Sequence, residues 1–364
     1  MKQYSFIFIL AFAALFFSNC GGDDFEVPAD FSLDEEVQRI MEAHQIPGVQ
    51  LAIVKNERLV ERKSFGFANV ELNEPVNDSS LFRIASISKP ITVAGFLILN
   101  QRNELDLDAK VFGENGVLGT KYGKAPYSSK IESITVRHLI EHKAGGWPND
   151  SNDPMFFDNS LSHEELISFV IDSIPLIYEP GTQVLYSNFG YCLLGRVIEE
   201  VSGLDYHLFI KQNLLEPSGI NTMEIGSNTI EEMLKNEVKY YNNQFDYSPY
   251  KPNVSRFDAN GGWVASSTDL LKLMVRLDRN PNKADIIDTN TLSQTYLGNI
   301  SWGHSGALPG TCTYLEKYND EFAFAFLCNG NSYEYETATN ELIEALQSEI
   351  YIRESWPDVD FFDE

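Results

Sequence analysis

Cysteine is scarce in this chain, with four residues among 364. Cys20 closes an amino-terminal apolar segment, which leaves Cys192, Cys312 and Cys328 for the rest of the chain. An odd number of cysteines is not the pattern of a disulfide framework, so stability must come from an apolar core. Cys312 and Cys328 fall in neighbouring predicted strands, where one bridge is conceivable. Burial as small apolar side chains is the favoured interpretation.

Positive charge is also sparse. The chain has 27 Lys and Arg residues against 53 Asp and Glu residues, which gives a formal net charge of −26. Binding to a phosphate backbone needs clusters of cations, so no nucleic-acid partner is expected. Hydrophobic residues make up 43% of the chain, which is enough for one large domain or two intertwined domains with a sizeable core.

Long apolar runs are few, and the longest lies at the amino terminus, over residues 6–17. This run follows the basic Lys2 and is too short to cross a bilayer comfortably, so residues 1–19 are interpreted as a signal peptide. The following Cys20, with two glycines and two aspartates after it, resembles a bacterial lipoprotein cleavage site. We therefore expect an exported protein that is anchored to a membrane through a lipidated Cys20 and a tether over residues 20–32, on the periplasmic or cell-surface face.

Hydrophobic periodicity predicts strands at both ends of the chain and helices between them. Strands are expected over residues 49–54, 59–65, 302–307, 311–318 and 321–328. Helices are expected over residues 33–44, 91–100, 136–142, 162–173, 190–202, 206–214, 268–279 and 334–352.

This order of elements predicts an α+β fold rather than βαβ repeats. An antiparallel β-sheet built from both termini would be flanked by helices, with a mostly helical subdomain inserted over about residues 105–255. The folded domain is expected to span residues 33–352, and residues 353–364 form an acidic tail.

A serine and a lysine, Ser86 and Lys89, stand three positions apart just before the predicted helix 91–100. At this spacing, helical side chains share one face, with Cβ atoms about 5–6 Å apart. Serine needs a neighbouring base to become a nucleophile, and a lysine with a lowered pKa can be that base. The free N–H groups at a helix start suit a developing oxyanion. Alone, this short pattern is more often an ordinary turn. Pro90 predicts an irregular start to the helix.

A second motif, Tyr186-Ser187-Asn188, precedes another predicted helix. A tyrosine hydroxyl beside a cationic amine ionises more easily, and a phenolate is a strong base. The Asn188 amide can accept a hydrogen bond from Lys89 and donate one to a substrate.

A third motif, His304-Ser305-Gly306, lies on or beside a late predicted strand. Gly306 would let a substrate backbone lie close against the strand edge. The backbone N–H groups of Ser86 and Ala307 would then converge on one oxygen.

With these three motifs in order, the sequence resembles the serine β-lactamase and penicillin-binding-protein-like hydrolases. The resemblance is strongest to the branch of class C β-lactamases, D,D-peptidases, D-aminopeptidases and related esterases. The matching segments are distributed between about residues 35 and 350: residues 82–90, 137–146, 179–182, 186–191, 194–195, 260–263, 266–270 and 303–306.

The resemblance implies a serine hydrolase that needs no cofactor or metal and acts on a small-molecule or peptide substrate. We expect a monomer, although the sequence does not determine the oligomeric state. Ser86 would form an acyl-enzyme that water later hydrolyses, and Lys89 with Tyr186 would act as general base and then general acid. Asn188 would orient Lys89 and the substrate. Backbone N–H groups of Ser86 and Ala307 would bind the oxyanion, and Ser305, Gly306 and Trp263 would contact the substrate.

The third motif departs from the Lys-Thr-Gly of many β-lactam-hydrolysing members, because His304 stands where a permanent cation is usual. Histidine is mostly neutral near pH 7, so it is less suited to a substrate carboxylate. We therefore expect an esterase or a D-amino-acid peptidase with weak or no β-lactamase activity. A slow, penicillin-recognising sensor that acylates but hardly turns over is the alternative.

A metal-dependent interpretation of another segment is a remote alternative. Residues 138–142 fit the H-x-x-E-H pattern of some zinc peptidases, in which His138 and His142 would grip the ion from one helix face. No third ligand is evident in the sequence, and the family resemblance accounts for the segment without metal.

Overall fold

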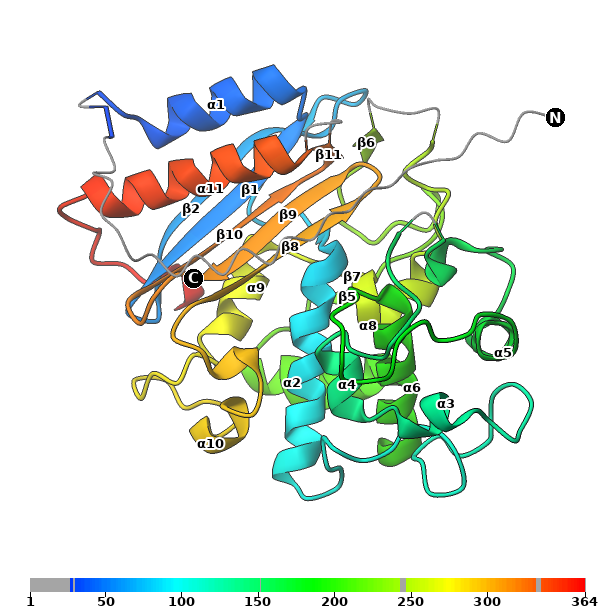
Figure 1. Ribbon diagram of the computed structural model, residues 1–364. Coiled ribbons are helices and arrows are strands. Elements are labelled where there is room, and N and C mark those ends of the chain that lie inside the picture. Colours follow the sequence, from blue (N-terminus) through cyan, green and yellow to red (C-terminus); the bar gives the residue numbers. More distant parts are fainter. Residues whose placement is uncertain (1–26, 29, 151, 243–246, 332–334, 364) are drawn as a thin grey trace.

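The computed structural model describes residues 27–28, 30–150, 152–242, 247–331 and 335–363. Its centre is a six-stranded antiparallel sheet in the order β3-β2-β1-β10-β9-β8 (Figure 1). The strands are β1 (Gly48–Lys55), β2 (Arg58–Asn69), β3 (Glu74–Pro75), β8 (Trp302–Leu308), β9 (Thr311–Lys317) and β10 (Phe322–Cys328). Strands from the two ends of the chain meet where β1 pairs with β10, which confirms the predicted sheet.

Helices α1 (Leu33–His44) and α11 (Tyr335–Ile352) cover one face of this sheet (Figure 1). Successive strand residues point to opposite faces, so the sequence of β10 decides what each face offers. Phe324 and Phe326 point toward α1 and α11, whereas Ala323 and Ala325 point toward the other helices. The small side chains of Ala323 and Ala325 let the helices on that face approach the sheet closely.

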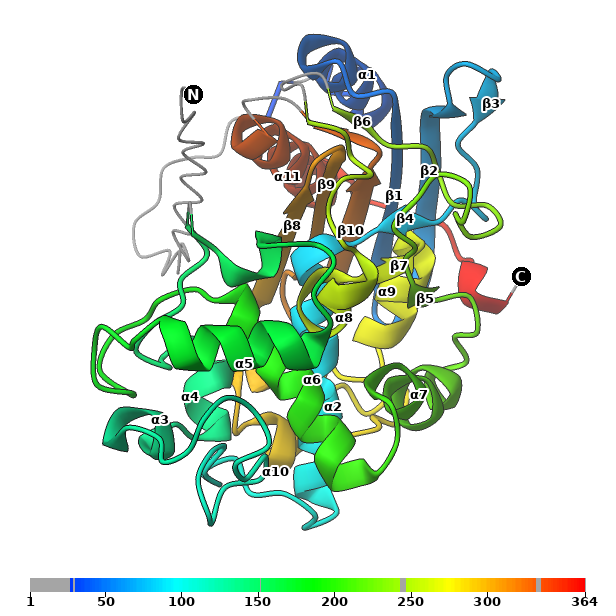
Figure 2. The same ribbon diagram turned by 90° about the vertical axis from the view of Figure 1, so that its right-hand side faces the viewer.

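The opposite face carries the helical part of the molecule, which surrounds α2 (Ser88–Gln101) (Figure 2). Helix α2 is buried from Ser88 to Leu99 on all sides, as expected for a central helix that is apolar all round. Around it lie α3 (Ser129–Ser133), α4 (Val136–Ile140), α5 (His163–Ser173), α6 (Asn188–Ser202), α7 (Tyr206–Ile210), α8 (Asp258–Gly261), α9 (Ser267–Met274) and α10 (Thr289–Leu292). Two small sheets, β4-β7-β5 and β11-β6, complete it: β4 (Phe82–Arg83), β5 (Glu224–Ile225), β6 (Tyr241–Asn242), β7 (Trp263–Ala265) and β11 (Gly330–Asn331).

Several details differ from the sequence predictions. Helix α4 ends at Ile140 rather than at residue 142. Helix α9 (Ser267–Met274) starts one residue before the predicted range and ends at Met274 rather than at residue 279, and Ser266 caps its start by accepting a hydrogen bond from the Asp269 N–H. Part of the acidic tail packs against the sheet, where the Asp360 carboxylate accepts a hydrogen bond from the Leu59 N–H.

The cysteines of the described residues are free and buried. Cys312 and Cys328 face each other across β9 and β10 as thiols. The predicted signal peptide and Cys20 lie outside the described residues. Within the described part of the chain, no helix combines the length and the apolar character that a membrane crossing needs.

Candidate active site

The Ser86 segment is a tight 3-10 turn, Ala85–Ile87, between β4 and α2, which confirms the irregular helix start. Ala85 has a φ of 47°, a left-handed conformation that is unfavourable for alanine and is kept only where the surroundings enforce it. The surroundings here are β8 and β9. The Thr313 hydroxyl donates to the Ile84 carbonyl over 3.1 Å. Gly306 lies so close that a Cβ atom there would be 2.2 Å from the same carbonyl oxygen.

Lys89 is completely buried, and its Nζ lies 3.0 Å from the Ser86 Oγ. It also donates to the side-chain oxygen of Asn188 and the backbone carbonyl of Asn260, both at 2.8 Å. Burial lowers the pKa of Lys89 to about 7, and the charge of Asp153 partly opposes this effect. When Lys89 is neutral, its two N–H groups can donate hydrogen bonds to the side-chain oxygen of Asn188 and the carbonyl oxygen of Asn260. Its lone pair then faces Ser86, as a general base requires.

Asn188 is the first residue of α6, and Ser187 caps that helix by accepting a hydrogen bond from the Gly190 N–H. This cap fixes the backbone from which the Asn188 side chain projects. The Asn188 Nδ2 donates to Asp153 Oδ2 over 2.7 Å, while its oxygen accepts from Lys89. The amide therefore bridges a buried amine and a buried carboxyl group.

Asp153 was not among the predicted site residues. It is 3% exposed and precedes the 3-10 turn Pro154–Phe156, where its Oδ1 accepts from the Met155 N–H over 2.9 Å. Burial raises its pKa to about 6. An aspartate before a proline is a helix-cap signal in sequence, so the turn was predictable. Its contact with Asn188 was not, because it depends on how two distant loops pack.

Tyr186 is half-buried beside Lys89, whose Nζ lies 4.7 Å from the centre of the tyrosine ring. The His142 ring packs between Tyr186 and Tyr191, with centroid distances of 4.3 and 5.1 Å. The Ser187 N–H donates to His142 Nδ1 over 3.1 Å, which places the imidazole proton on Nε2. Burial and the nearby Lys89 lower the pKa of His142 well below its usual value. The His142 ring is therefore neutral, and it packs between the two tyrosine rings.

The zinc alternative is wrong, because it needs both histidines on one helix face. Helix α4 ends at Ile140, and His142 follows with a φ of 58°. The His138 ring instead accepts a hydrogen bond from the Thr135 N–H at the start of the helix. Among the residues that the structure describes, no group of three His, Cys, Asp or Glu side chains could hold a metal ion.

His304 lies on β8 opposite Leu315, with its ring 6.5 Å from the Tyr186 ring. Its Nδ1 donates to the Ser305 carbonyl over 2.7 Å, so Nε2 carries no proton in the neutral ring. Burial is the largest effect on the pKa of His304 and lowers it, and the nearby charge of Lys89 lowers it further. The hydrogen bond to the Ser305 carbonyl raises the pKa by less, so the net result is a pKa of about 3. His304 is therefore neutral at physiological pH. Ser305 and Ala307 follow it on the same strand, both half-buried.

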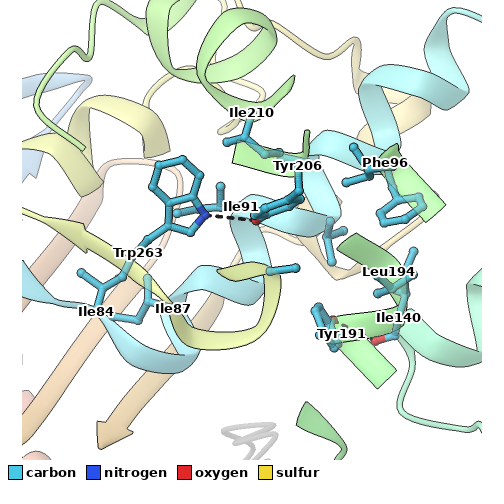
Figure 3. Close-up of a cluster of buried hydrophobic side chains, with 14 of the residues drawn as sticks. Ile84, Ile87, Ile91, Phe96, Ile140, Tyr191, Leu194, Tyr206, Ile210 and Trp263 are labelled. Atoms are coloured by element: carbon cyan, nitrogen blue, oxygen red, sulfur yellow. Dashed lines mark hydrogen bonds between the residues drawn. The ribbon is translucent and has the colours of Figure 1, made fainter. Parts of the chain in front are cut away.

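Trp263, predicted to contact the substrate, is placed differently. Its side chain is fully buried, and its indole N–H donates to the Tyr206 hydroxyl over 3.1 Å within the hydrophobic core (Figure 3). This corrects the sequence prediction: Trp263 is a core residue. The Trp263 backbone N–H donates to the Ser88 hydroxyl, so the residue supports the start of α2 from behind.

The remaining predicted residues are brought together from separate parts of the chain. Ser86 and Lys89 come from the start of α2, and Tyr186 with Asn188 from the start of α6. Strand β8 contributes His304, Ser305 and Ala307. Gly306 on the same strand is buried against Ile84 and Thr313, which corrects the prediction that it contacts the substrate. Asn260 and Asp153 join them from segments to which sequence reasoning gave no catalytic part.

Comparison with known proteins identifies the family of the chain. The family model described as Beta-lactamase matches residues 33–348. Penicillin-binding protein 4* of Bacillus subtilis (strain 168) is 31% identical over 195 residues, which cover 50% of this chain and 39% of that protein. Protein flp of Staphylococcus aureus (strain N315) is 24% identical over 254 residues, covering 68% of this chain and 49% of that protein. The chain thus spans less than half the length of these curated relatives.

Among solved structures, the D-amino acid amidase from Ochrobactrum anthropi SV3, complexed with D-phenylalanine, superposes with a TM-score of 0.71 at 21% identity. The match covers 88% of this chain and 99% of the amidase. The octameric penicillin-binding protein homologue from Pyrococcus abyssi gives a TM-score of 0.70 at 23% identity, covering 88% of this chain and 76% of that one. The chain belongs to the beta-lactamase family of serine hydrolases.

Proposed function

We propose that this protein is an exported serine hydrolase that cleaves an ester or amide bond through an acyl-enzyme on Ser86. The observation that carries the proposal is the position of the Lys89 amine, 3.0 Å from the Ser86 hydroxyl and held by two carbonyl oxygens. A pKa of about 7 leaves about half of the amine neutral at pH 7. A base with a pKa near the operating pH is the most effective proton acceptor.

The chemistry then runs in two halves. Lys89, with Tyr186 beside it, takes the Ser86 proton as the oxygen attacks the substrate carbonyl, and the proton passes on to the leaving group. Backbone N–H groups of Ser86 and Ala307 stabilise the oxyanion. Water then attacks the acyl-enzyme, loses a proton to the same base and releases the acid with Ser86 restored.

The neutral state of His304 supports a substrate that needs no cation at this position. A substrate carboxylate bound here would gain no ion pair from His304, whose pKa lies far below neutrality. Esters, amides and D-amino-acid derivatives do not all carry that carboxylate, whereas β-lactam antibiotics generally do. We therefore favour an esterase or a D-amino-acid peptidase with weak or no β-lactamase activity.

The test is a hydrolysis panel of p-nitrophenyl esters, D-amino-acid amides, a D-Ala-D-Ala peptide and a chromogenic cephalosporin. We expect turnover of an ester or a D-amino-acid amide, with the cephalosporin slowest. Ser86→Ala should abolish turnover and labelling by a fluorophosphonate, whereas Ser301→Ala, an exposed serine at the edge of β8, should change neither. Labelling of Ser86 without turnover of any substrate would favour the sensor instead.

We also propose that Cys20 carries a lipid and holds the protein on a membrane. The proposal rests on the sequence of residues 1–24, which lie outside the described part of the chain. In a bacterial host, the protein should incorporate labelled palmitate and sediment with membranes. Cys20→Ser should remove both properties, and Cys192→Ser should leave both intact. Incorporation that persists in Cys20→Ser would contradict the assignment.

A further inference from the structure

One buried carboxyl group contacts the site without a role in the reaction as written above. Asp153 lies between α4 and α5 and is 3% exposed. Burial of a carboxylate is unfavourable unless hydrogen bonds or an opposite charge stabilise it. Asp153 has both, since Met155 and Asn188 donate to its two oxygens and the charge of Lys89 lowers its pKa.

We propose that Asp153 is a positioning residue, which holds the Asn188 amide with its oxygen toward Lys89 and supplies the negative charge that balances the Lys89 ammonium during acyl transfer. This inference rests on the proposed function, because it takes Ser86 and Lys89 as the reacting groups.

Asp153 fixes the orientation of the Asn188 amide. A carboxylate only accepts hydrogen bonds, and an ammonium only donates them. An amide between the two has one orientation that satisfies both neighbours, with its NH2 group toward the carboxylate and its oxygen toward the ammonium. Asn188 has this orientation, at 2.7 Å from Asp153 and 2.8 Å from Lys89. Among the residues that the structure describes, Asp153 is the acceptor for the Asn188 NH2 group, so its removal takes away the contact that distinguishes the two ends of the amide.

Asp153 also supplies a negative charge to the surroundings of Lys89. The groups around Lys89 from the other elements are the Ser86 hydroxyl, the amide oxygen of Asn188, the Asn260 carbonyl and the rings of Tyr186 and Tyr191. The two nearby histidines, His142 and His304, have lowered pKa values and are neutral. Asp153 is the group whose charge raises the pKa of Lys89. When the Ser86 proton reaches Lys89 in this buried place, Asp153 stabilises the cation that forms.

The loop that carries Asp153 is anchored independently of the site. The buried Arg256 guanidinium donates to the carbonyl oxygens of Met155, Asp158 and Leu161. The loop backbone should therefore keep its place when the Asp153 side chain changes. Asp150, on the same loop, is exposed and bonds to the Asn152 N–H. The charge of Asp150 raises the pKa of Asp153. Asp150→Asn is therefore a matched control, because it removes a charge from the same loop and leaves the contact between Asp153 and Asn188 in place.

The experiment compares the wild type with Asp153→Asn and Asp150→Asn. It measures the rate of Ser86 labelling by a fluorophosphonate, and kcat/KM for a p-nitrophenyl ester, from about pH 5 to about pH 9. In Asp153→Asn, the new amide can offer its single oxygen to Met155 or to Asn188, but not to both, and it carries no charge. We expect kcat/KM to fall roughly ten- to a hundredfold, the usual effect of losing a hydrogen bond to a charged group.

The pH profile separates this role from a merely structural one. The negative charge of Asp153 favours the ammonium form of Lys89, so its removal lowers the pKa of Lys89. The acid limb, which is the part of the profile where kcat/KM rises with pH, should therefore move to lower pH in Asp153→Asn. Asp150→Asn should keep the wild-type limb and rate. A slower Asp153→Asn enzyme with an unmoved limb, or one as fast as the wild type, overturns the inference. A wild type that neither labels nor hydrolyses any substrate would instead refute the proposed function.

A second variant covers the case in which Asp153→Asn does not fold, as judged by its thermal unfolding. Asp153→Glu keeps the charge but displaces it by one methylene, so it should lower kcat/KM while leaving the acid limb near the wild-type pH. A limb that moves in Asp153→Glu would contradict the charge argument. In a double-mutant cycle, Asp153→Asn should add little to Asn188→Ala, because both remove the same bridge.

Discussion

Lys89 Nζ lies 3.0 Å from Ser86 Oγ. The two residues are about one helical turn apart along the chain, at the junction of a 3-10 turn and α2. The pair is local in sequence, but the groups that tune it are not. Asn188 comes from α6 and Asn260 from α8, and both bond to the same amine. Burial of that amine lowers its pKa into the range in which a lysine can accept a proton. The start of α2 therefore brings a serine hydroxyl and an amine together, and the surrounding structure sets the basicity of that amine.

Lys89→Met tests the base. Methionine has a similar length and no charge, so it suits a side chain that is fully buried and should leave the fold intact. We expect kcat to fall about 10²–10⁴-fold, the usual size of general acid–base catalysis. Steady-state hydrolysis of a p-nitrophenyl ester measures it. Lys143→Met, at a partly exposed lysine that pairs with Glu141, is the matched control. An unchanged kcat in Lys89→Met would assign the base to another group.

Tyr186→Phe tests the second proton-transfer group. It keeps the ring that packs against His142 and removes the hydroxyl. We expect a loss of about 10²–10⁴-fold in kcat with little change in KM, because proton transfer acts in the transition state. Tyr178→Phe, an exposed tyrosine on the preceding loop, should behave as the wild type. A rise in KM with kcat retained would make Tyr186 a substrate contact instead.

The pH dependence follows from the pKa of Lys89. Below a pH of about 7 the amine is protonated and cannot accept the Ser86 proton, so kcat/KM should rise with pH and level off above that value. His304, with its pKa at about 3, should not contribute a second step in this range, whereas Asp153, with its pKa at about 6, titrates on the same acidic side of the profile. The same limb should appear in the labelling rate of Ser86. A rate that is flat between about pH 5 and about pH 9 would show that the ionisation of Lys89 does not limit the reaction.

The sequence alone predicted the parts of the site that are encoded locally. The Ser86–Lys89 spacing, the start of α6 at the Tyr186 motif and the strand β10 each depend on neighbouring residues, and each is present in the structure. The position of Asp153 could not be predicted, because its contact with Asn188 joins two loops through tertiary packing. Trp263 was misplaced for a related reason. A tryptophan in a family motif can face a ligand or the core, and here its hydrogen bond to Tyr206 directs it inward.

Gly306→Ala tests the clamp on the nucleophile turn. The new Cβ would lie 2.2 Å from the Ile84 carbonyl oxygen and 2.4 Å from the Thr313 hydroxyl, so β8 or the turn must move. We expect a destabilisation of about 1–3 kcal/mol in urea unfolding and a loss of activity larger than that of any surface variant. Gly303→Ala is the control, because its closest neighbour is the end of the Tyr314 side chain, which can move aside. Equal activity in both variants would show that close approach at Gly306 is not needed.

His304→Lys tests the link between the third motif and the substrate. A neutral ring at this position gives no ion pair to a carboxylate, whereas a lysine places an amine beside Tyr186 that forms an ion pair when it is protonated. A charge-assisted hydrogen bond is worth about 1.5–3 kcal/mol, which corresponds to a factor of roughly ten or more. The kcat/KM for a cephalosporin, divided by that for a neutral p-nitrophenyl ester, should therefore rise about tenfold or more in His304→Lys.

The ratio cancels effects that the new charge has on Lys89, because both substrates depend on the same base. His304→Gln, which stays neutral, should leave the ratio unchanged. If His304→Lys also leaves it unchanged, residue 304 does not select against carboxylates, and the argument against β-lactam hydrolysis loses its physical basis.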